Sequence, residues 1–161
     1  MSHQTSLAVV IWDVGGTLVS RVLNNVEIVG RALLSVGVRP EQLQPEAIRR
    51  VQKEYTETYL FWRTPKEEAN EYRRLATLLL EGVESSADRG RIGRLSDRLA
   101  GYFDAYRPVA GIQNLLGELA GHGIRQAVLS NWPQSLRSFL DHHGLSGYFS
   151  VIVSSADAVA L

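Results

Sequence analysis

Asp13 stands where an apolar run of the sequence ends, a position at which a carboxylate can do chemistry. Gly15, Gly16 and Thr17 follow it directly. Glycines let the backbone turn sharply, and backbone N–H groups together with a threonine hydroxyl suit an oxyanion. A carboxylate beside such donors is either a nucleophile toward phosphorus or carbon, or a ligand for a divalent metal ion.

A second polar pair, Ser130 and Asn131, follows another apolar run much later in the chain. Parallel strands bring their carboxyl ends to one edge of a sheet, so we expect this hydroxyl and this amide to face Asp13. Each motif alone has a plainer interpretation. Asp-x-Gly is common turn chemistry, and a serine shortly before Pro133 is typical of a helix N-cap. The two motifs together, on either side of a long helical segment, favour a shared site.

Three short apolar runs predict the strands of a parallel sheet. Residues 7–12 are rich in Val and Ile and predict a strand buried on both faces, and residues 124–129 and 149–153 predict two more. A helical stripe over residues 112–119 precedes the second strand, and Pro133 opens a helix before the third. Strand, helix, strand in this order predicts right-handed parallel crossovers.

The long segment between these parts has helical spacing instead. Four apolar stripes predict four helices, and Thr64, Pro65 and Glu67 have the spacing of an N-cap, a first helical position and a capping box. The first of the stripes comprises Val22, Val26, Val29 and Leu33.

The predicted fold class is therefore α/β. It has a Rossmann-like parallel-sheet core, incomplete with about three strands, in residues 1–20 and 108–161. An inserted all-helical cap forms residues 21–107. An insertion after the first strand overhangs the carboxyl ends of the strands, where ligands bind in open α/β sheets. Arg21 and Asn24 begin the cap next to the site, and we expect them to contact substrate.

Composition narrows the class of protein. The chain has 161 residues, 45% of them hydrophobic, and its 17 basic residues balance 17 acidic ones. We therefore expect no nucleic-acid partner and no attraction to an anionic membrane. The absence of cysteine excludes thiolate chemistry and fits a reducing cytoplasm. No apolar run is long enough to span a bilayer and no signal peptide is recognisable, so we expect a cytoplasmic protein.

The segments IWDVGGTL and AVLSNW resemble motifs I and II of the haloacid dehalogenase superfamily, in its subfamily with a helical cap inserted after motif I. The resemblance implies phosphatase-type hydrolysis of a small phosphorylated metabolite through an aspartyl-phosphate on Asp13. It also implies Mg²⁺ as cofactor, held by the Asp13 carboxylate and the backbone carbonyl of Gly15. The residues that it assigns to the phosphate are Gly16, Thr17, Ser130 and Asn131.

The chain departs from the family pattern at Gly15. Phosphatases of the family carry a second aspartate there, which protonates the leaving group, and a glycine has no proton to give. Loss of a general acid costs about 10²- to 10⁴-fold in rate. An acyl phosphate has a better leaving group and needs that acid less. A haloacid needs none, although dehalogenases of the family have a tyrosine at this position.

The second departure concerns the later family motifs, which add a lysine and further acidic metal ligands. They do not follow SSADAVAL here, and the two lysines, Lys53 and Lys66, both fall in predicted cap helices. We therefore expect weak or no activity from this chain. In the family order, the absence of these motifs would also leave the first strand as a bare apolar edge. Such an edge predicts a homodimer or a strand swap, unless the chain is a fragment of a longer protein.

Three alternatives to the phosphatase remain. A catalytically silent module that keeps the fold for association is consistent with both departures. Haloacid dehalogenase-type hydrolysis of a carbon–halogen bond is a minor alternative. An actin-like sugar kinase shares the Asp-Val-Gly-Gly-Thr pattern of the phosphate loop, but its loop joins two strands, whereas residues 22–34 here have helical spacing.

Overall fold

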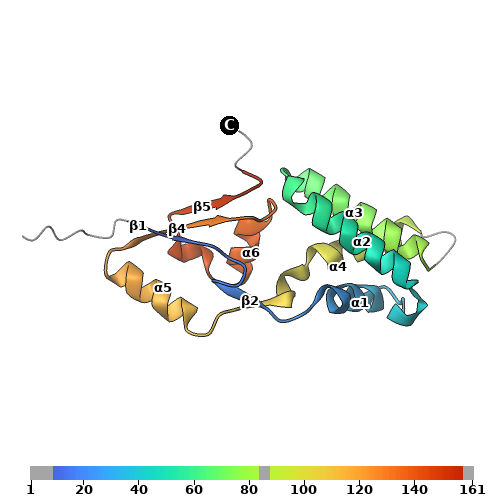
Figure 1. Cartoon of the computed structure of the whole chain (residues 1–161), viewed down its shortest axis with the longest axis horizontal. Coiled ribbons are helices and arrows are strands. Elements are labelled where there is room, and N and C mark those ends of the chain that lie inside the picture. Colours follow the sequence, from blue (N-terminus) through green and yellow to red (C-terminus); the bar gives the residue numbers. More distant parts are fainter. Residues whose placement is uncertain (1–8, 84–87, 158–161) are drawn as a thin grey trace, which may run out of the picture. The chain divides into compact units, whose positions relative to one another are not determined.

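The computed structural model describes residues 9–83 and 88–157, which fall into two compact units (Figure 1). The first unit contains the described residues up to Ser20 and those from Arg107 onward. The second unit is the segment 21–106 between them. The first unit is a mixture of strands and helices, whereas helices dominate the second.

The first unit is built on a parallel sheet in the order β1-β4-β5, with β4 at its centre. The strands are β1 (Val9–Trp12), β4 (Arg125–Ser130) and β5 (Val151–Ser154). Helix α5 (Ile112–Gly121) precedes β4, and α6 (Leu136–His142) connects β4 to β5. The α/β fold class with a parallel sheet of three strands is thus as predicted. Two further short strands, β2 and β3, form a separate two-stranded sheet; their bounds are Val19–Arg21 and Tyr106–Pro108.

Among the described residues, one face of the three-stranded sheet is more deeply buried than the other. Gln126 and Val128 are buried, whereas Ile11, Leu129 and Val151 are 62%, 56% and 52% exposed. The connections from β1 to β4 and from β4 to β5 move across the sheet in the same direction. Right-handed connections therefore place α5 and α6 on the same face. The prediction of a first strand buried on both faces is therefore wrong for the described part of that run, which starts at residue 9.

Several predicted element ends are also corrected. The second strand begins and ends one residue later than predicted, and the third begins two residues later and ends one residue later. Pro133 does not open a helix, because α6 starts only at Leu136. Ser130 is consequently not an N-cap; that position belongs to Ser135, whose side chain makes no capping hydrogen bond.

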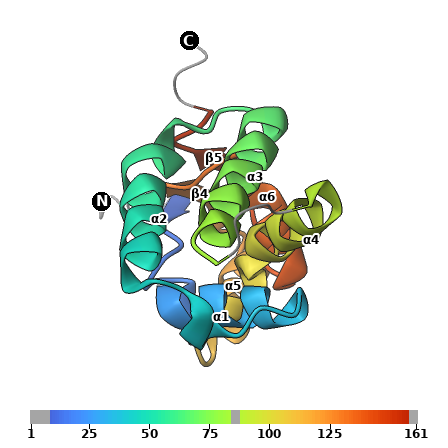
Figure 2. The ribbon, with the colours of Figure 1, turned by 90° about the vertical axis from the view of Figure 1, so that its right-hand side faces the viewer.

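In the helical unit, α3 packs against both α2 and α4, and α1 packs against α4 (Figure 2). Among the described residues of both units, no helix has the length and apolar character needed to cross a membrane. The four helices are α1 (Asn25–Ser35), α2 (Pro45–Thr58), α3 (Pro65–Glu81) and α4 (Arg89–Ala100). Short 3₁₀ turns join or follow them: η1 (Pro40–Gln42), η2 (Tyr59–Phe61) and η3 (Tyr102–Ala105).

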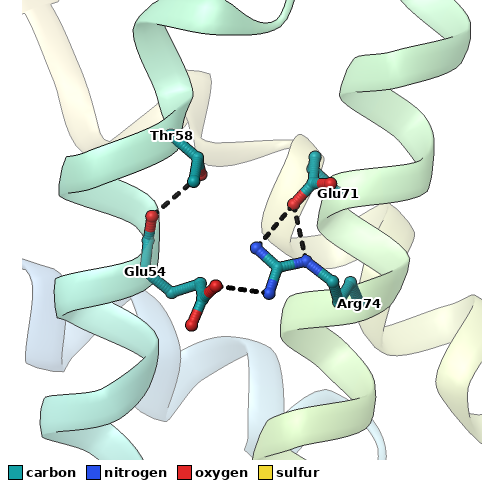
Figure 3. Close-up of polar contacts among 4 residues, drawn as sticks. All are labelled: Glu54, Thr58, Glu71 and Arg74. Atoms are coloured by element: carbon teal, nitrogen blue, oxygen red, sulfur yellow. Dashed lines mark hydrogen bonds and ion pairs between the residues drawn. The ribbon is translucent and has the colours of Figure 1, made fainter.

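An arginine links α2 to α3 (Figure 3). Arg74 Nη1 lies 2.6 Å from a carboxylate oxygen of Glu54, and its Nε donates to Glu71 at 2.7 Å. The hydrogen bond with Glu71 contributes most to raising the pKa of Arg74 above its ordinary value, and that with Glu54 adds to it. Thr58 donates from its hydroxyl to the backbone carbonyl of Glu54, at 2.8 Å. Because the ion pair is partly exposed, solvent screens it and its contribution to stability is modest.

The capping box predicted at Thr64 is confirmed. The Thr64 hydroxyl accepts from the backbone N–H of Glu67 at 3.1 Å, and the Glu67 carboxylate accepts from the Thr64 N–H at 3.0 Å. The apolar stripe of the first helix is corrected, because Val22 and Val26 are 49% and 55% exposed. The side of α1 that is buried runs instead through Val29, Ala32 and Leu33.

Candidate active site

Asp13 follows β1 directly and begins a tight loop. Within this loop the Val14 carbonyl accepts hydrogen bonds from the N–H groups of Leu18 and Val19, at 3.0 and 3.1 Å. Gly16 has a φ of +78°, a left-handed conformation that side-chain-bearing residues rarely adopt. The predicted sharp turn is therefore present, and it needs a glycine at Gly16 rather than at Gly15.

The structure brings Asp13 and Ser130 together, although 117 positions separate them in the sequence. The Ser130 hydroxyl donates to Asp13 Oδ1 at 2.7 Å. The register explains the contact: Trp12 pairs with Val128 in the parallel sheet, so the next residues of the two strands reach the same edge. Ser130 is buried and Asp13 is exposed. The hydrogen bond thus holds one carboxylate oxygen and leaves the other without a donor among the described residues.

The other residues that the resemblance assigns to the phosphate differ in whether their hydrogen-bond donors are available. The Gly16 N–H donates to the Val19 carbonyl at 2.8 Å, and the Thr17 N–H donates to Val14 at 3.2 Å. These two amides are already engaged in the loop, so they do not form the donor cradle expected from the glycines. The Thr17 hydroxyl and the Asn131 carboxamide are exposed and have no hydrogen-bond partner among the described residues. They are the side-chain donors that remain.

The two expected substrate contacts of the cap have local partners. The Asn24 side chain accepts from the backbone N–H of Glu27 at 3.0 Å and is the N-cap of α1. Arg21 donates to Asn25 and lies 5.8 Å from the centre of the Tyr106 ring. Lys53 and Lys66 lie on α2 and α3 as predicted, and Lys53 is 3.9 Å from Glu57.

A second set of contacts, which the sequence interpretation missed, fixes the segment after Ser130. The Ser155 N–H donates to the Ser130 carbonyl at 3.0 Å, and the Ser155 hydroxyl donates to the Trp132 carbonyl at 3.2 Å. Asp157 accepts from the backbone N–H of Ser154 at 2.8 Å. The Ser-x-x-Asp spacing of residues 154–157 is a turn signal that could have indicated this contact.

Oxygen donors at Asp13 suit a hard divalent cation. The Asp13 carboxylate and the Gly15 carbonyl belong to one turn, and Mg²⁺ is commonly held by one or two carboxylates, waters and substrate phosphate. No cluster of three or more His, Cys, Asp or Glu side chains that could hold a metal is found among the described residues. The donor set therefore fits a Mg²⁺ ion that keeps much of its water, and not an ion enclosed by protein ligands.

Comparison with known proteins places this geometry in a family. A family model described as haloacid dehalogenase-like hydrolase matches residues 10–160. A solved structure from Thermotoga maritima, assigned as a beta-phosphoglucomutase, is similar with a TM-score of 0.57 and 19% identity over 93% of this chain. A haloacid dehalogenase-superfamily hydrolase of subfamily IA from Geobacter sulfurreducens gives a TM-score of 0.51 and 17% identity over 95% of this chain.

These similarities show the fold, and they cover only part of the relatives. The chain spans 62% of the Thermotoga protein and 65% of the Geobacter protein. A haloacid dehalogenase-type phosphatase from Thermococcus onnurineus is matched over 63% of its length and 94% of this chain, with a TM-score of 0.50 and 18% identity. A search of curated proteins finds no match.

Proposed function

The chain belongs to the haloacid dehalogenase-like hydrolase family, and from this premise we propose that it hydrolyses a small phosphorylated metabolite with Asp13 as the nucleophile. The observation that carries the proposal is the 2.7 Å hydrogen bond from Ser130 to Asp13 Oδ1. This bond orients the carboxylate and leaves Oδ2 for attack. An exposed, oriented carboxylate at the carboxyl edge of a parallel sheet is suited to covalent catalysis.

In the proposed reaction, an Asp13 oxygen attacks phosphorus and the bond from phosphorus to the leaving-group oxygen breaks. An aspartyl-phosphate forms on Asp13. A water oxygen then attacks this phosphorus, which releases inorganic phosphate and restores the carboxylate. Thr17 and Asn131 supply the side-chain donors to the phosphoryl oxygens, and Ser130 keeps the carboxylate in position.

A bound Mg²⁺ would neutralise negative charge on the carboxylate and the phosphoryl group, which otherwise repel each other. The Asp13 carboxylate and the Gly15 carbonyl are the groups that would hold it. Support comes from the oxygen donor set and from the family.

The leaving group determines which phosphates suit this site. Gly15 has no side chain to protonate the departing oxygen, so an alkoxide must take its proton from water. A carboxylate leaving group, as in an acyl phosphate, departs without this proton. We therefore propose that acyl phosphates are hydrolysed faster than alkyl phosphomonoesters, by up to about the 10²- to 10⁴-fold that a general acid contributes.

The test measures phosphate release from acetyl phosphate, p-nitrophenyl phosphate and glycerol phosphate in Mg²⁺. We expect acetyl phosphate to be cleaved fastest and Asp13→Asn to abolish cleavage of all three. Asp141→Asn is the matched control, because Asp141 is an exposed carboxylate on α6 of the same unit. Activity that survives Asp13→Asn would remove Asp13 from the mechanism.

The two alternatives, a catalytically silent module and a dehalogenase, predict different results. A catalytically silent module releases no phosphate from any of the three compounds. A dehalogenase releases halide from chloroacetate instead, with the same dependence on Asp13. The absence of an acid at Gly15 is consistent with both, and the hydrogen bond to Ser130 does not separate them.

A further inference from the structure

A groove of about 190 Å³ lies in the helical unit, between α1, the C-terminal end of α4 and the following turn η3. Ile28, Arg31, Ala32 and Ser35 line it from α1. Their spacing of three and four residues puts these side chains on one face of the helix. The opposite wall includes Arg98, and all of the lining residues belong to the helical unit.

The groove has an excess of positive charge. Arg31 and Arg98 line it together with one carboxylate, that of Asp104. Both arginines are exposed, and neither forms an ion pair among the described residues. In the same unit, by contrast, Arg74 has two carboxylate partners. Two guanidinium groups beside one cavity are thus available to an external anion.

The rest of the lining limits the size and character of a ligand. Ile28, Ala32 and Ala105 present apolar atoms, and the Tyr102 side chain adds an aromatic surface. Pockets for drug-sized ligands have volumes of about 300–1,000 Å³, so this groove suits a smaller molecule. A short carbon skeleton would contact the apolar lining while an oxyanion contacts the arginines, because guanidinium groups bind carboxylates and phosphates in two-point geometry.

We propose that this groove is a binding site for a small organic oxyanion, a short carboxylate or phosphate ester, held by Arg31 and Arg98. All of the lining residues belong to the helical unit, and Asp13 belongs to the other unit. Binding here does not depend on the proposed hydrolysis. Because both arginines are exposed, the affinity falls as ionic strength rises.

The experiment measures binding to the full chain by titration calorimetry at low ionic strength, with three probes: succinate, glycerol phosphate and inorganic phosphate. The Asp13→Asn protein is used, so that hydrolysis does not contribute. We expect saturable binding, about tenfold or more weaker in Arg98→Gln and in Arg31→Gln, in line with the loss of a charged hydrogen bond. Arg98→Lys keeps the positive charge but not the two-point geometry of a guanidinium, so we expect its affinity to lie between that of the parent protein and that of Arg98→Gln.

Arg73→Gln is the matched control. Arg73 is an exposed arginine of α3 that does not line the groove, and its guanidinium has no partner among the described residues. Its loss should leave the affinity unchanged. If Arg73→Gln weakens binding as much as the groove variants do, the effect comes from the overall charge of the protein and the proposal is wrong. Equal affinity in Arg98→Gln and the parent protein would also overturn it. Tighter binding of succinate or of glycerol phosphate identifies the oxyanion that the site prefers.

Discussion

A single missing side chain at Gly15 limits the chemistry that Asp13 can perform, and the structure shows that the position can accept one. Gly15 has no positive φ, and a Cβ built on it would meet only the Trp132 ring, at an ordinary 3.8 Å. We predict that Gly15→Asp raises the rate on alkyl phosphomonoesters by about 10²- to 10⁴-fold, with less effect on acetyl phosphate. The measurement is kcat/KM for both classes of substrate.

Gly16→Asp is the control for this substitution. It adds the same carboxylate one residue later, where φ is +78° and a side chain is strained. It should lower the stability without raising monoesterase activity. If Gly15→Asp leaves the ratio of the two substrate classes unchanged, the interpretation of Gly15 as a missing acid is incorrect.

The Ser130 hydroxyl gives the second prediction at the scale of residues. Ser130→Ala removes the donor to Asp13 Oδ1, a hydrogen bond to a charged group worth about 1.5–3 kcal/mol. We expect kcat/KM for acetyl phosphate to fall about 10- to 100-fold, while the circular dichroism spectrum is unchanged. Ser138→Ala, at an exposed serine of α6, is the control. Unaltered kcat/KM in Ser130→Ala would show that the bond does not orient the carboxylate.

The meeting of Asp13 and Ser130 was predictable, because both directly follow apolar runs that form parallel strands. The use of the loop amides was not, since only the structure shows that the Gly16 N–H donates to Val19. Asn24 was interpreted as a substrate contact although the sequence Asn24-Asn-Val-Glu27 has the spacing of a capping box. The structure uses its side chain in this local role.

At the scale of elements, a buried glutamine ties the first strand to a helix. Gln126 on β4 is 2% exposed; its side-chain oxygen accepts from Trp12 Nε1 at 3.2 Å and its nitrogen donates to the Leu116 carbonyl at 2.9 Å. Gln126→Leu keeps the approximate volume and breaks both contacts. We predict a loss of about 1–3 kcal/mol in the free energy of unfolding, measured in urea, whereas Gln113→Leu on the exposed side of α5 changes little.

The neighbouring strand β4 shows why the burial of the first strand was overestimated from sequence. A continuous run of Val and Ile predicts burial on both faces, but it says nothing about how many helices cover the sheet. Polar Gln126 lies on the buried face, while Leu129 lies on the exposed one. The types of the three strands of the parallel sheet and of the helices were predictable from their periods, whereas the short strands β2 and β3 were not predicted. The environment of an element depends on tertiary packing, which the period does not contain.

At the scale of the whole molecule, two tyrosines, the buried Tyr72 and the half-buried Tyr55, make stability depend on alkaline pH. Burial raises the pKa of Tyr55 and Tyr72 above the ordinary value of 10.0, because the phenolate is desolvated. Below about pH 10 the tyrosines are protonated in both the folded and the unfolded state, so the free energy of unfolding does not depend on them. Above it the unfolded chain loses the proton first, so stability falls by up to about 1.4 kcal/mol per pH unit for each tyrosine.

Tyr72→Phe tests this dependence. The Tyr72 hydroxyl is buried and has no hydrogen-bond partner among the described residues, so its removal should cost nothing at pH 7 and could stabilise by about 1 kcal/mol. Between pH 10 and 11, we expect the free energy of unfolding to fall less steeply with pH in Tyr72→Phe than in the parent protein. The difference should be about the contribution of one tyrosine. A slope identical to that of the parent protein would contradict the assignment to Tyr72.

The edge strand β1 bears on the association of whole molecules. Among the described residues, β1 pairs only with β4, so its other edge is unpaired, and Ile11 on the open face of this strand is 62% exposed. An apolar edge of this kind favours pairing with a second copy, and self-association through it stays a prediction.

Light scattering during size-exclusion chromatography should show a mass that rises with concentration. Ile11→Lys should suppress this rise, whereas Leu115→Lys, at an exposed leucine of α5, should not. A monomer at every concentration, for the parent chain and both variants, would exclude the edge as a self-association surface.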